Sequence, residues 1–273
     1  MTVNWGSVVA TAIAAVVFLG CAVPGMAQDW ARTALEKSPR HGEWVTVKHG
    51  DRAVQAFVVY PETKGKAQAV VVIHEIFGLT DWARGVADQL AAAGYIAIAP
   101  DLLSGFGPNG GKSSDFTSVD ASREAVSKLD AETVTADLNA VTDYVRALPA
   151  ATGQVSVAGF CWGGGQAFRF ATNRHDLNAA YVFYGPAPEK VDAIIAPVYG
   201  FYGGEDARIT ATVDPTVMAM KGAGKKYEPV VYKNAGHGFM RSGQDPAGKA
   251  ADKEAREEAW ERWLDLLKRN AGK

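Results

Sequence analysis

The residues best suited to chemistry lie in the segment Gly159-Phe160-Cys161-Trp162-Gly163 of the 273-residue chain. Its spacing is that of Gly-x-Ser-x-Gly, the nucleophile elbow, with cysteine in place of serine. In such an elbow a strand turns sharply into a helix, and the backbone N–H after the nucleophile, here that of Trp162, can hold an oxyanion. The alternative is a buried cysteine in a glycine-rich strand-to-helix turn, which is common in nucleotide-binding folds. No Gly-x-Gly-x-x-Gly with a following acidic residue supports a dinucleotide site here.

A nucleophile elbow needs an acid and then a histidine later in the chain. Asp206 and His237 satisfy this order, and each follows an expected strand, where α/β sheets place their sites. His237 would move the thiol proton of Cys161, and Asp206 would orient the imidazole. Two alternatives stay open for the acid: Asp206 could be a turn residue, and the adjacent Glu205 is a rival. The pattern predicts a Cys161-His237-Asp206 triad.

Strands and helices alternate along the chain around these residues. Short continuous apolar runs are typical of parallel strands buried on both faces, and helical spacing separates them. The pattern predicts a single-domain α/β fold over residues 28–273, with a mostly parallel sheet flanked by helices. The expected strands are 53–59, 69–74, 95–99, 154–158, 179–184, 197–202 and 227–232, the expected helices are 81–93, one or two within 122–148, 163–173 and 249–269, an opening hairpin turns at 64–68, and 104–120 is an exposed loop.

Composition excludes several classes of function. A formal net charge of -2 gives no electrostatic sign of nucleic-acid binding. The histidines are scattered, and neither CxxC nor HExxH occurs, so we expect no metal and no cofactor. We expect a small-molecule substrate and favour a monomer.

The N-terminal segment has the pattern of a signal peptide. Residues 8–23 are almost wholly apolar or small, and Gly25-Met26-Ala27 offers a small-x-small cleavage site, although residues 1–7 carry no Lys or Arg. We therefore expect residues 1–27 to be removed and the protein to be periplasmic or secreted. Acylation of Cys21 and an uncleaved anchor are the alternatives. Cleavage would leave Cys161 as the single cysteine of an exported protein, where a thiol is exposed to oxidation.

The segments HEIFGLTDWARGVADQLAAAGYIAIAPDLLSG, GFCWGGG, YGGEDARI and AGHGFMR together resemble the dienelactone hydrolase family of the α/β-hydrolase fold. The resemblance runs from about residue 45 to the closing helix and implies a fold without a large cap domain. It also implies that Glu75 lies beside the thiol and helps to deprotonate it when substrate binds. Ile76 would give a second oxyanion N–H. The alternative for Glu75 is a structural carboxylate that caps the following helix.

The resemblance implies a substrate carboxylate bound by two arginines. Arg241 lies four residues after His237 and matches one of them. Arg123 is the nearest match to the other, in a region that is shorter here than in the family. For both, the alternative is a solvated surface charge.

The thiol favours particular acyl groups. A thiol has a pKa of about 8.5, whereas the pKa of a simple alcohol is close to that of water, about 15.7. The thiolate is therefore the better leaving group, and the adduct of a thiolate with an alkyl ester expels the thiolate. Enol lactones, aryl esters and thioesters have better leaving groups. The sequence therefore predicts a hydrolase of activated esters of the dienelactone type that acts through a cysteinyl thioester. The alternatives are a general periplasmic carboxylesterase or thioesterase, and a binding protein with an inactive elbow.

Overall fold

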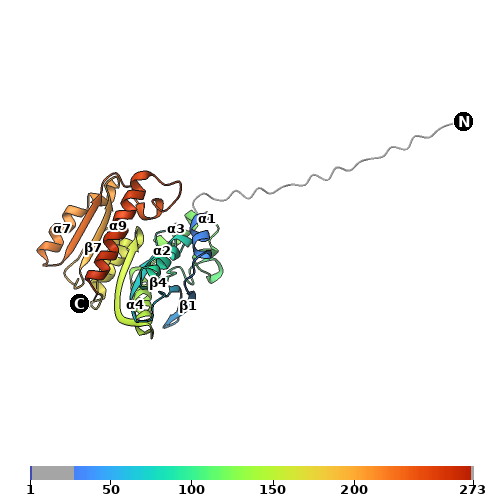
Figure 1. The fold of residues 1–273 in the computed structure, drawn as a ribbon, viewed down its shortest axis with the longest axis horizontal. Coiled ribbons are helices and arrows are strands. Elements are labelled where there is room, and N and C mark those ends of the chain that lie inside the picture. The colour runs from blue at the N-terminus through green and yellow to red at the C-terminus, as the bar shows by residue number, and fades with distance from the viewer. Residues whose placement is uncertain (2–27, 272–273) are drawn as a thin grey trace.

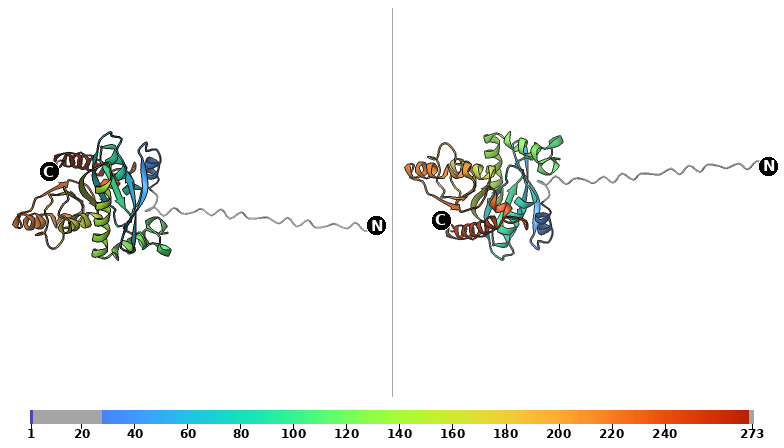
Figure 2. Two further views of the ribbon diagram at one scale, coloured as in Figure 1. Left: turned by 90° about the horizontal axis from the view of Figure 1, so that it is seen from below. Right: turned by 90° about the horizontal axis from the view of Figure 1, so that it is seen from above.

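The computed structural model describes residue 1 and residues 28–271, in which a twisted sheet is covered by helices on both faces (Figures 1 and 2). In this part of the chain, eight strands form one sheet in the order β1-β2-β4-β3-β5-β6-β7-β8. The pairs β1–β2 and β2–β4 are antiparallel, and every later pair is parallel. The strands are β1 (Gly42–His49), β2 (Arg52–Val59), β3 (Ala67–Ile73), β4 (Ile96–Pro100), β5 (Ala151–Phe160), β6 (Ala180–Phe183), β7 (Val198–Gly203) and β8 (Tyr227–Tyr232).

Two apolar layers hold the helices against the sheet. Helices α1, α2, α8 and α9 contribute buried residues to one layer, and α4, α5, α6 and α7 to the other. The helices are α1 (Asp29–Glu36), α2 (Asp81–Ala92), α3 (Val119–Ser127), α4 (Ala131–Ala147), α5 (Trp162–Asn173), α6 (Ala207–Thr210), α7 (Val213–Gly222), α8 (Phe239–Ser242) and α9 (Ala250–Arg269), with short 3₁₀ turns at Pro108–Gly110 and Ser113–Asp115.

Strand β3 shows why the sheet is buried on both faces. Val71 and Ile73 belong to one apolar layer, whereas Val70 and Val72 belong to the other, because successive side chains point to opposite faces. All four are fully buried. A continuous apolar run is the pattern that such a central parallel strand requires. The expected fold class is therefore confirmed.

The opening hairpin differs from the expectation. Strand β2 pairs with β1, His49 opposite Arg52, so the turn lies at Gly50-Asp51 rather than at 64–68. Gly50 has φ 51°, the left-handed conformation that such a tight turn favours. Segment 64–68 instead leads into β3, which pairs with β4 and β5 and not with β2.

The long helical region divides into α3 and α4. The side chain of Asp130 accepts a hydrogen bond from the Thr133 N–H at 2.8 Å and so caps the start of α4. The expected loop 104–120 contains the two 3₁₀ turns and the first residues of α3. The remaining expected elements are present at nearly the expected bounds.

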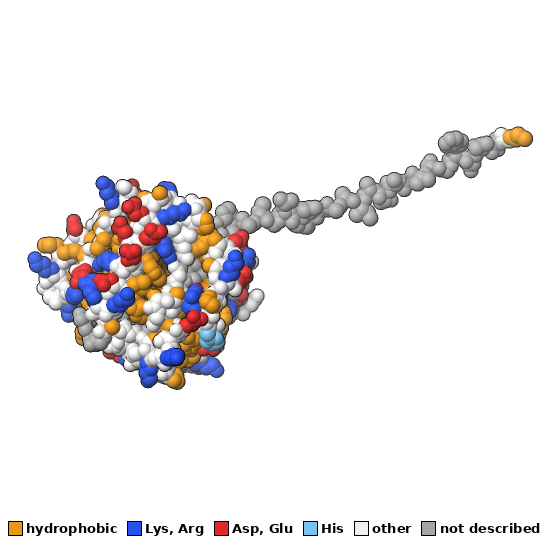
Figure 3. Space-filling model, viewed as in Figure 1, with side chains coloured by type: hydrophobic (Ala, Val, Ile, Leu, Met, Phe, Trp, Pro, Cys, Tyr) orange, Lys and Arg blue, Asp and Glu red, His pale blue; other side chains and the backbone are white. Residues whose placement is uncertain are grey.

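The predicted signal peptide and Cys21 lie outside the described residues, apart from Met1. Gln28, the first residue after the expected cleavage site, accepts a hydrogen bond through Oε1 from the Trp82 N–H at 3.0 Å. No helix within residues 28–271 is long and apolar enough to cross a membrane. Acidic and basic side chains are interspersed on the face shown in Figure 3.

Candidate active site

Cys161 lies at a sharp turn between β5 and α5. Its φ of 56° and ψ of -117° are values that residues other than glycine rarely adopt. The flanking glycines are required because backbones approach closely here. A Cβ on Gly159 would overlap the Gly163 carbonyl, and one on Gly163 would overlap the His74 carbonyl. The turn thus places the thiol at the carboxyl end of β5, as the Gly-x-Cys-x-Gly spacing predicts.

The structure brings Cys161, His237 and Asp206 into one line. His237 Nε2 lies 3.1 Å from Cys161 Sγ, and His237 Nδ1 lies 2.5 Å from Asp206 Oδ2. Asp206 follows β7 and His237 follows β8, and these strands are parallel neighbours whose carboxyl ends lie together. Asp206 is buried, whereas the rival Glu205 is exposed. The geometry therefore favours Asp206 as the partner of the histidine.

The pKa of His237 is raised from 6.5 to about 9. Burial lowers the pKa of this imidazole, but hydrogen bonds to Cys161 and Asp206, together with their negative charge, outweigh that effect. His237 can therefore hold a proton at neutral pH between the sulfur and the carboxylate.

Two further residues shape this site, and sequence reasoning missed both because neither belongs to a recognisable motif. Asp252 of α9 is buried and accepts hydrogen bonds from the Gly236 N–H and the Ser242 hydroxyl, both at 2.8 Å, so it fixes the loop that holds His237. Tyr184 has φ 41° and packs edge-on against the imidazole of His237, with ring centroids 5.0 Å apart. Both contacts depend on how neighbouring elements pack around the His237 loop.

Glu75 forms an ion pair with Arg241 next to this line. Arg241 Nε donates to Glu75 Oε2 at 2.7 Å, and the carboxyl is only 3% exposed. Burial raises the pKa of Glu75, while the charge and hydrogen bond of Arg241 oppose the rise. The charge of Glu75 in turn raises the pKa of Arg241.

The surroundings of Glu75 exclude one of its two interpretations and leave its part in catalysis a prediction. Helix α2 is capped by Thr80, whose side chain accepts from the Ala83 N–H, so Glu75 is not its cap. In the described part of the chain Glu75 forms no hydrogen bond with the resting thiol, since Cys161 contacts His237 and Glu75 contacts Arg241. A guanidinium offers a buried carboxylate a stronger, charge-assisted bond than a thiol does.

The two expected oxyanion donors lie on adjacent turns. Strands β3 and β5 are parallel neighbours, with Ile73 opposite Gly159, so Ile76 and Trp162 follow paired strand ends. Trp162 is the first residue of α5, and its N–H has no acceptor within the helix. The Ile76 N–H forms no backbone hydrogen bond within the described chain. Both donors are available to an external oxygen.

The structure does not bring Arg123 to this group. Its side chain is 54% exposed on α3, and its nearest acid is Asp120 at 3.8 Å. Its role in substrate binding stays a prediction. The preceding residue, Ser122, donates through its hydroxyl to the Phe77 carbonyl at 2.8 Å.

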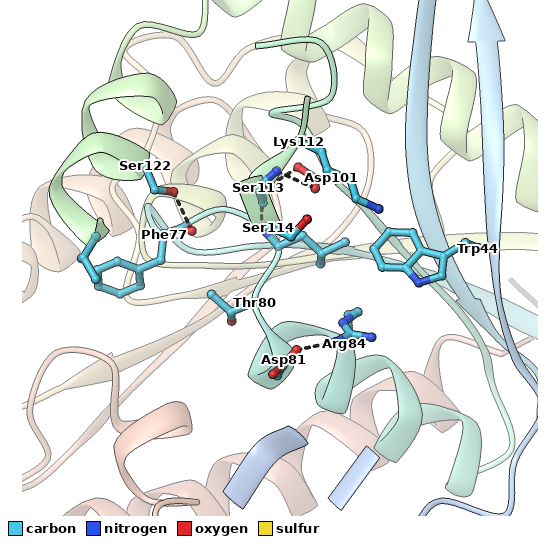
Figure 4. A pocket seen from close by; sticks show the side chains of 12 residues that line it. Trp44, Phe77, Thr80, Asp81, Arg84, Asp101, Lys112, Ser113, Ser114 and Ser122 are labelled. Atoms are coloured by element: carbon cyan, nitrogen blue, oxygen red, sulfur yellow. Dashed lines mark hydrogen bonds and ion pairs between the residues drawn. The ribbon is translucent and has the colours of Figure 1, made fainter. Parts of the chain in front are cut away.

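A cavity of about 360 Å³ adjoins the site and is not lined by Cys161, His237 or Asp206 (Figure 4). Phe77 forms part of its wall, and the guanidinium of Arg241 lies 5.3 Å from the centroid of the same ring. At its other end Lys112 lies 4.3 Å from the ring centroid of Trp44. Sequence reasoning missed this cavity because its walls come from β1, α2 and the loop 104–120. Within residues 28–271, no cluster of three His, Cys, Asp or Glu side chains could hold a metal ion.

The sheet order and the strand-end elbow, acid and histidine define an α/β-hydrolase. The family model "Dienelactone hydrolase family" matches residues 54–271. The chain therefore belongs to the dienelactone hydrolase family and is a hydrolase acting on ester bonds.

Individual relatives agree with this membership. The chain is 32% identical over 227 residues to the "Putative carboxymethylenebutenolidase" of Escherichia coli (strain K12), covering 78% of this chain and 80% of that protein. It is 30% identical over 237 residues to the "Carboxymethylenebutenolidase" of Pseudomonas putida, covering 82% and 95%. The crystal structure of "Putative Dienelactone Hydrolase" from Klebsiella pneumoniae subsp. pneumoniae MGH 78578 matches with a TM-score of 0.72 and 28% identity, covering 83% and 97%.

Proposed function

We propose that the protein hydrolyses activated esters, enol lactones above all, through a thioester formed on Cys161. The observation that carries this proposal is the continuous line from Cys161 Sγ to His237 Nε2 at 3.1 Å and from His237 Nδ1 to Asp206 Oδ2 at 2.5 Å. A nucleophile, its base and the group that orients the base are thereby within hydrogen-bond reach of one another. The name carboxymethylenebutenolidase, borne by two of the relatives, supports a lactone as the substrate.

The reaction proceeds in two stages. Sγ, having passed its proton to His237, adds to the carbonyl carbon, and the oxyanion takes hydrogen bonds from the N–H groups of Ile76 and Trp162. The C–O bond then breaks, and the enolate leaving group takes the proton from His237. In the second stage a water molecule gives a proton to His237 and adds to the thioester carbonyl. The C–S bond breaks, Sγ leaves and takes the proton back from His237, and the acid product forms.

The pair of Glu75 and Arg241 supports a substrate that carries a carboxylate. Arg241 is about one third exposed and presents a guanidinium beside the thiol, and a carboxylate is its natural ligand. A substrate carboxylate on Arg241 would compete with Glu75. Glu75, buried and freed from its cation, would then be a stronger proton acceptor. With such a substrate Glu75 would take the thiol proton in place of His237, whose own proton would go to the leaving group.

A substrate panel tests this proposal. The purified protein is offered a carboxylate-bearing enol lactone, the same lactone as its methyl ester, phenyl acetate, a thioester and ethyl acetate. We expect the charged lactone to have the highest kcat/KM and ethyl acetate to be turned over least, because the thiolate is the better leaving group from an alkyl-ester adduct. Equal rates on the two lactones would instead favour a general esterase. Turnover that survives stoichiometric alkylation of Cys161 by iodoacetamide would overturn the thioester mechanism.

We also propose that the protein is exported and that its mature chain begins at Gln28. The small-x-small site before Gln28, and the anchoring of the Gln28 side chain on the Trp82 N–H, support a mature chain that begins with the folded domain. Mass spectrometry of the protein recovered from the producing cell should give an N-terminal Gln28. An intact Met1 or a lipid on Cys21 would contradict the proposal.

A further inference from the structure

His74 is a fully buried histidine that the mechanism above does not use. It follows β3 directly and is 0% exposed. Its Nδ1 lies 2.7 Å from the Glu75 carbonyl oxygen, and its Nε2 has no hydrogen-bond partner within the described chain. Its ring stacks on the indole of Trp162, with centroids 5.5 Å apart and planes inclined by 16°. The imidazole of His74 is thus held at its edge by the Glu75 carbonyl and on its face by the Trp162 indole.

The hydrogen bond fixes the proton on the ring. A carbonyl oxygen can only accept, so Nδ1 must carry the hydrogen in the contact with Glu75. Burial lowers the pKa of His74, against the opposing charge of Asp101, so the ring is neutral and has a single proton. Asp101 itself is held by donors from Ser113, as Figure 4 shows. His74 is therefore the Nδ1–H tautomer.

The Glu75 carbonyl belongs to the same peptide unit as the Ile76 N–H, one of the two oxyanion donors. A hydrogen bond accepted by the oxygen of a peptide polarises it and strengthens its N–H as a donor. The stacked Trp162 supplies the other donor, and the His74 carbonyl lies directly against Gly163 in the same turn. The one residue thus touches both backbone turns that must hold a single oxygen atom.

We propose that His74 is a positioning residue for the oxyanion hole: it polarises and orients the Glu75–Ile76 peptide and fixes the Trp162 turn against it. This rests on the thioester mechanism proposed above. His74 touches no substrate and transfers no proton. Its contribution is made where charge develops in the transition state, so it acts on kcat rather than on KM.

Two matched variants separate the hydrogen bond from the packing. His74→Phe keeps an aromatic ring against Trp162 and removes the donor, whereas His74→Asn restores an N–H near the Nδ1 position. Removing a whole oxyanion donor costs about 10² to 10³ in kcat, so weakening one donor should cost about tenfold. We expect kcat on phenyl acetate to fall about tenfold in His74→Phe with KM little changed, and to recover largely in His74→Asn.

The alkylation rate of Cys161 distinguishes a role in the oxyanion hole from a general structural role, because a disturbed site would change this rate as well as turnover. Iodoacetamide forms an S–C bond and releases iodide without addition to a carbonyl, so no oxyanion arises. The alkylation rate of Cys161 should therefore stay within about twofold of wild type in both variants, because the oxyanion donors take no part in it. A loss of alkylation parallel to the loss of turnover, or a His74→Phe variant with wild-type kcat, would overturn the proposal.

Measurements on the unaltered chain keep the inference testable if the variants fold poorly. Nitrogen-15 NMR of the wild-type protein should show His74 protonated at Nδ1 and not at Nε2, and the opposite tautomer would overturn the proposal. Cys161→Ala serves as the control for the underlying mechanism. Wild-type turnover in Cys161→Ala would remove the thioester mechanism itself, whereas an inactive Cys161→Ala beside a fully active His74→Phe would remove only the role of His74.

Discussion

The site contains two buried carboxylates, Asp206 and Glu75, and their partners differ in kind. Asp206 binds an imidazole whose pKa is about 9 and which also contacts Cys161. Glu75 binds a guanidinium, which stays charged at any ordinary pH. The first pair can pass a proton along the line to the sulfur, and the second can change only if another anion displaces Glu75. The comparison separates a proton-transfer pair from a pair that can respond to substrate.

The largest expected effect comes from breaking the proton-transfer pair. Cys161→Ala and His237→Ala should each lower kcat by about 10⁴-fold or more, because the nucleophile or its base is gone. Asp206→Asn should keep a measurable remainder, since the imidazole is still present. Stopped-flow or steady-state rates on phenyl acetate measure these losses. Unchanged turnover in Cys161→Ala would exclude covalent catalysis at the elbow.

Glu75→Gln tests the second pair by removing its charge but not its hydrogen-bond acceptor. We expect kcat on a carboxylate-bearing enol lactone to fall by about 100-fold, the size of a lost general base. Thermal stability should change far less, because Gln can still accept from Arg241. The matched control is the methyl ester of the same lactone. A variant that unfolds while its folded fraction turns over normally would show that Glu75 is purely structural.

Arg241→Met sharpens the contrast by leaving Glu75 without its cation. Breaking a buried ion pair costs about 3–5 kcal/mol, and the partial exposure of Arg241 reduces this to about 2 kcal/mol. Burial then favours protonation of Glu75, since burial already raises the pKa of this carboxyl. Urea unfolding at neutral pH measures the loss. The double variant Arg241→Met/Glu75→Gln should recover most of it, and equal stability of single and double variants would contradict a charge effect.

The smallest expected effect is the pH dependence of stability that the proton-transfer pair contributes. The pKa of His237 is raised from 6.5 to about 9 on folding, so its protonated form stabilises the native state. That contribution is complete below pH 6.5 and is lost as the pH rises through about 9. The excess Tm of wild type over His237→Asn should therefore shrink across this window. A Tm excess that stays level across this window would contradict a proton held between Asp206 and Cys161.

The sequence predicted the elements that depend on local pattern. Cys161 could be found because the flanking glycines are required by a strand-to-helix turn, and Asp206 and His237 because each follows an apolar strand in a set order. Strands β2 to β8 and the long helices α2, α4, α5 and α9 followed from hydrophobic runs and periodicity, whereas β1 was not predicted. Helix α7 was missed, because Val213–Gly222 contains Pro215 and has few buried residues to give a periodic pattern.

The contacts between distant segments could not be read from the sequence. Glu75 and Arg241 are 166 residues apart, and their bond depends on where two loops lie. Asp252 looks like any helix-surface acid until α9 is packed against the His237 loop. His74 did leave a signal, a histidine that ends the apolar run of β3, but the identity of its partners required the fold.

The positions of the chemical groups along the sheet bear on how the enzyme can evolve. Glu75, Cys161, Asp206 and His237 follow four different strands, β3, β5, β7 and β8, all at their carboxyl ends. Each group therefore has a loop of its own, and loops tolerate insertion and replacement better than strands do. The sequence of one loop can change to fit a new substrate while the catalytic residues on the other loops stay in place. The cavity beside Phe77, lined by the loop after β3 together with β1, α2 and the segment before α3, gives such change a place to begin.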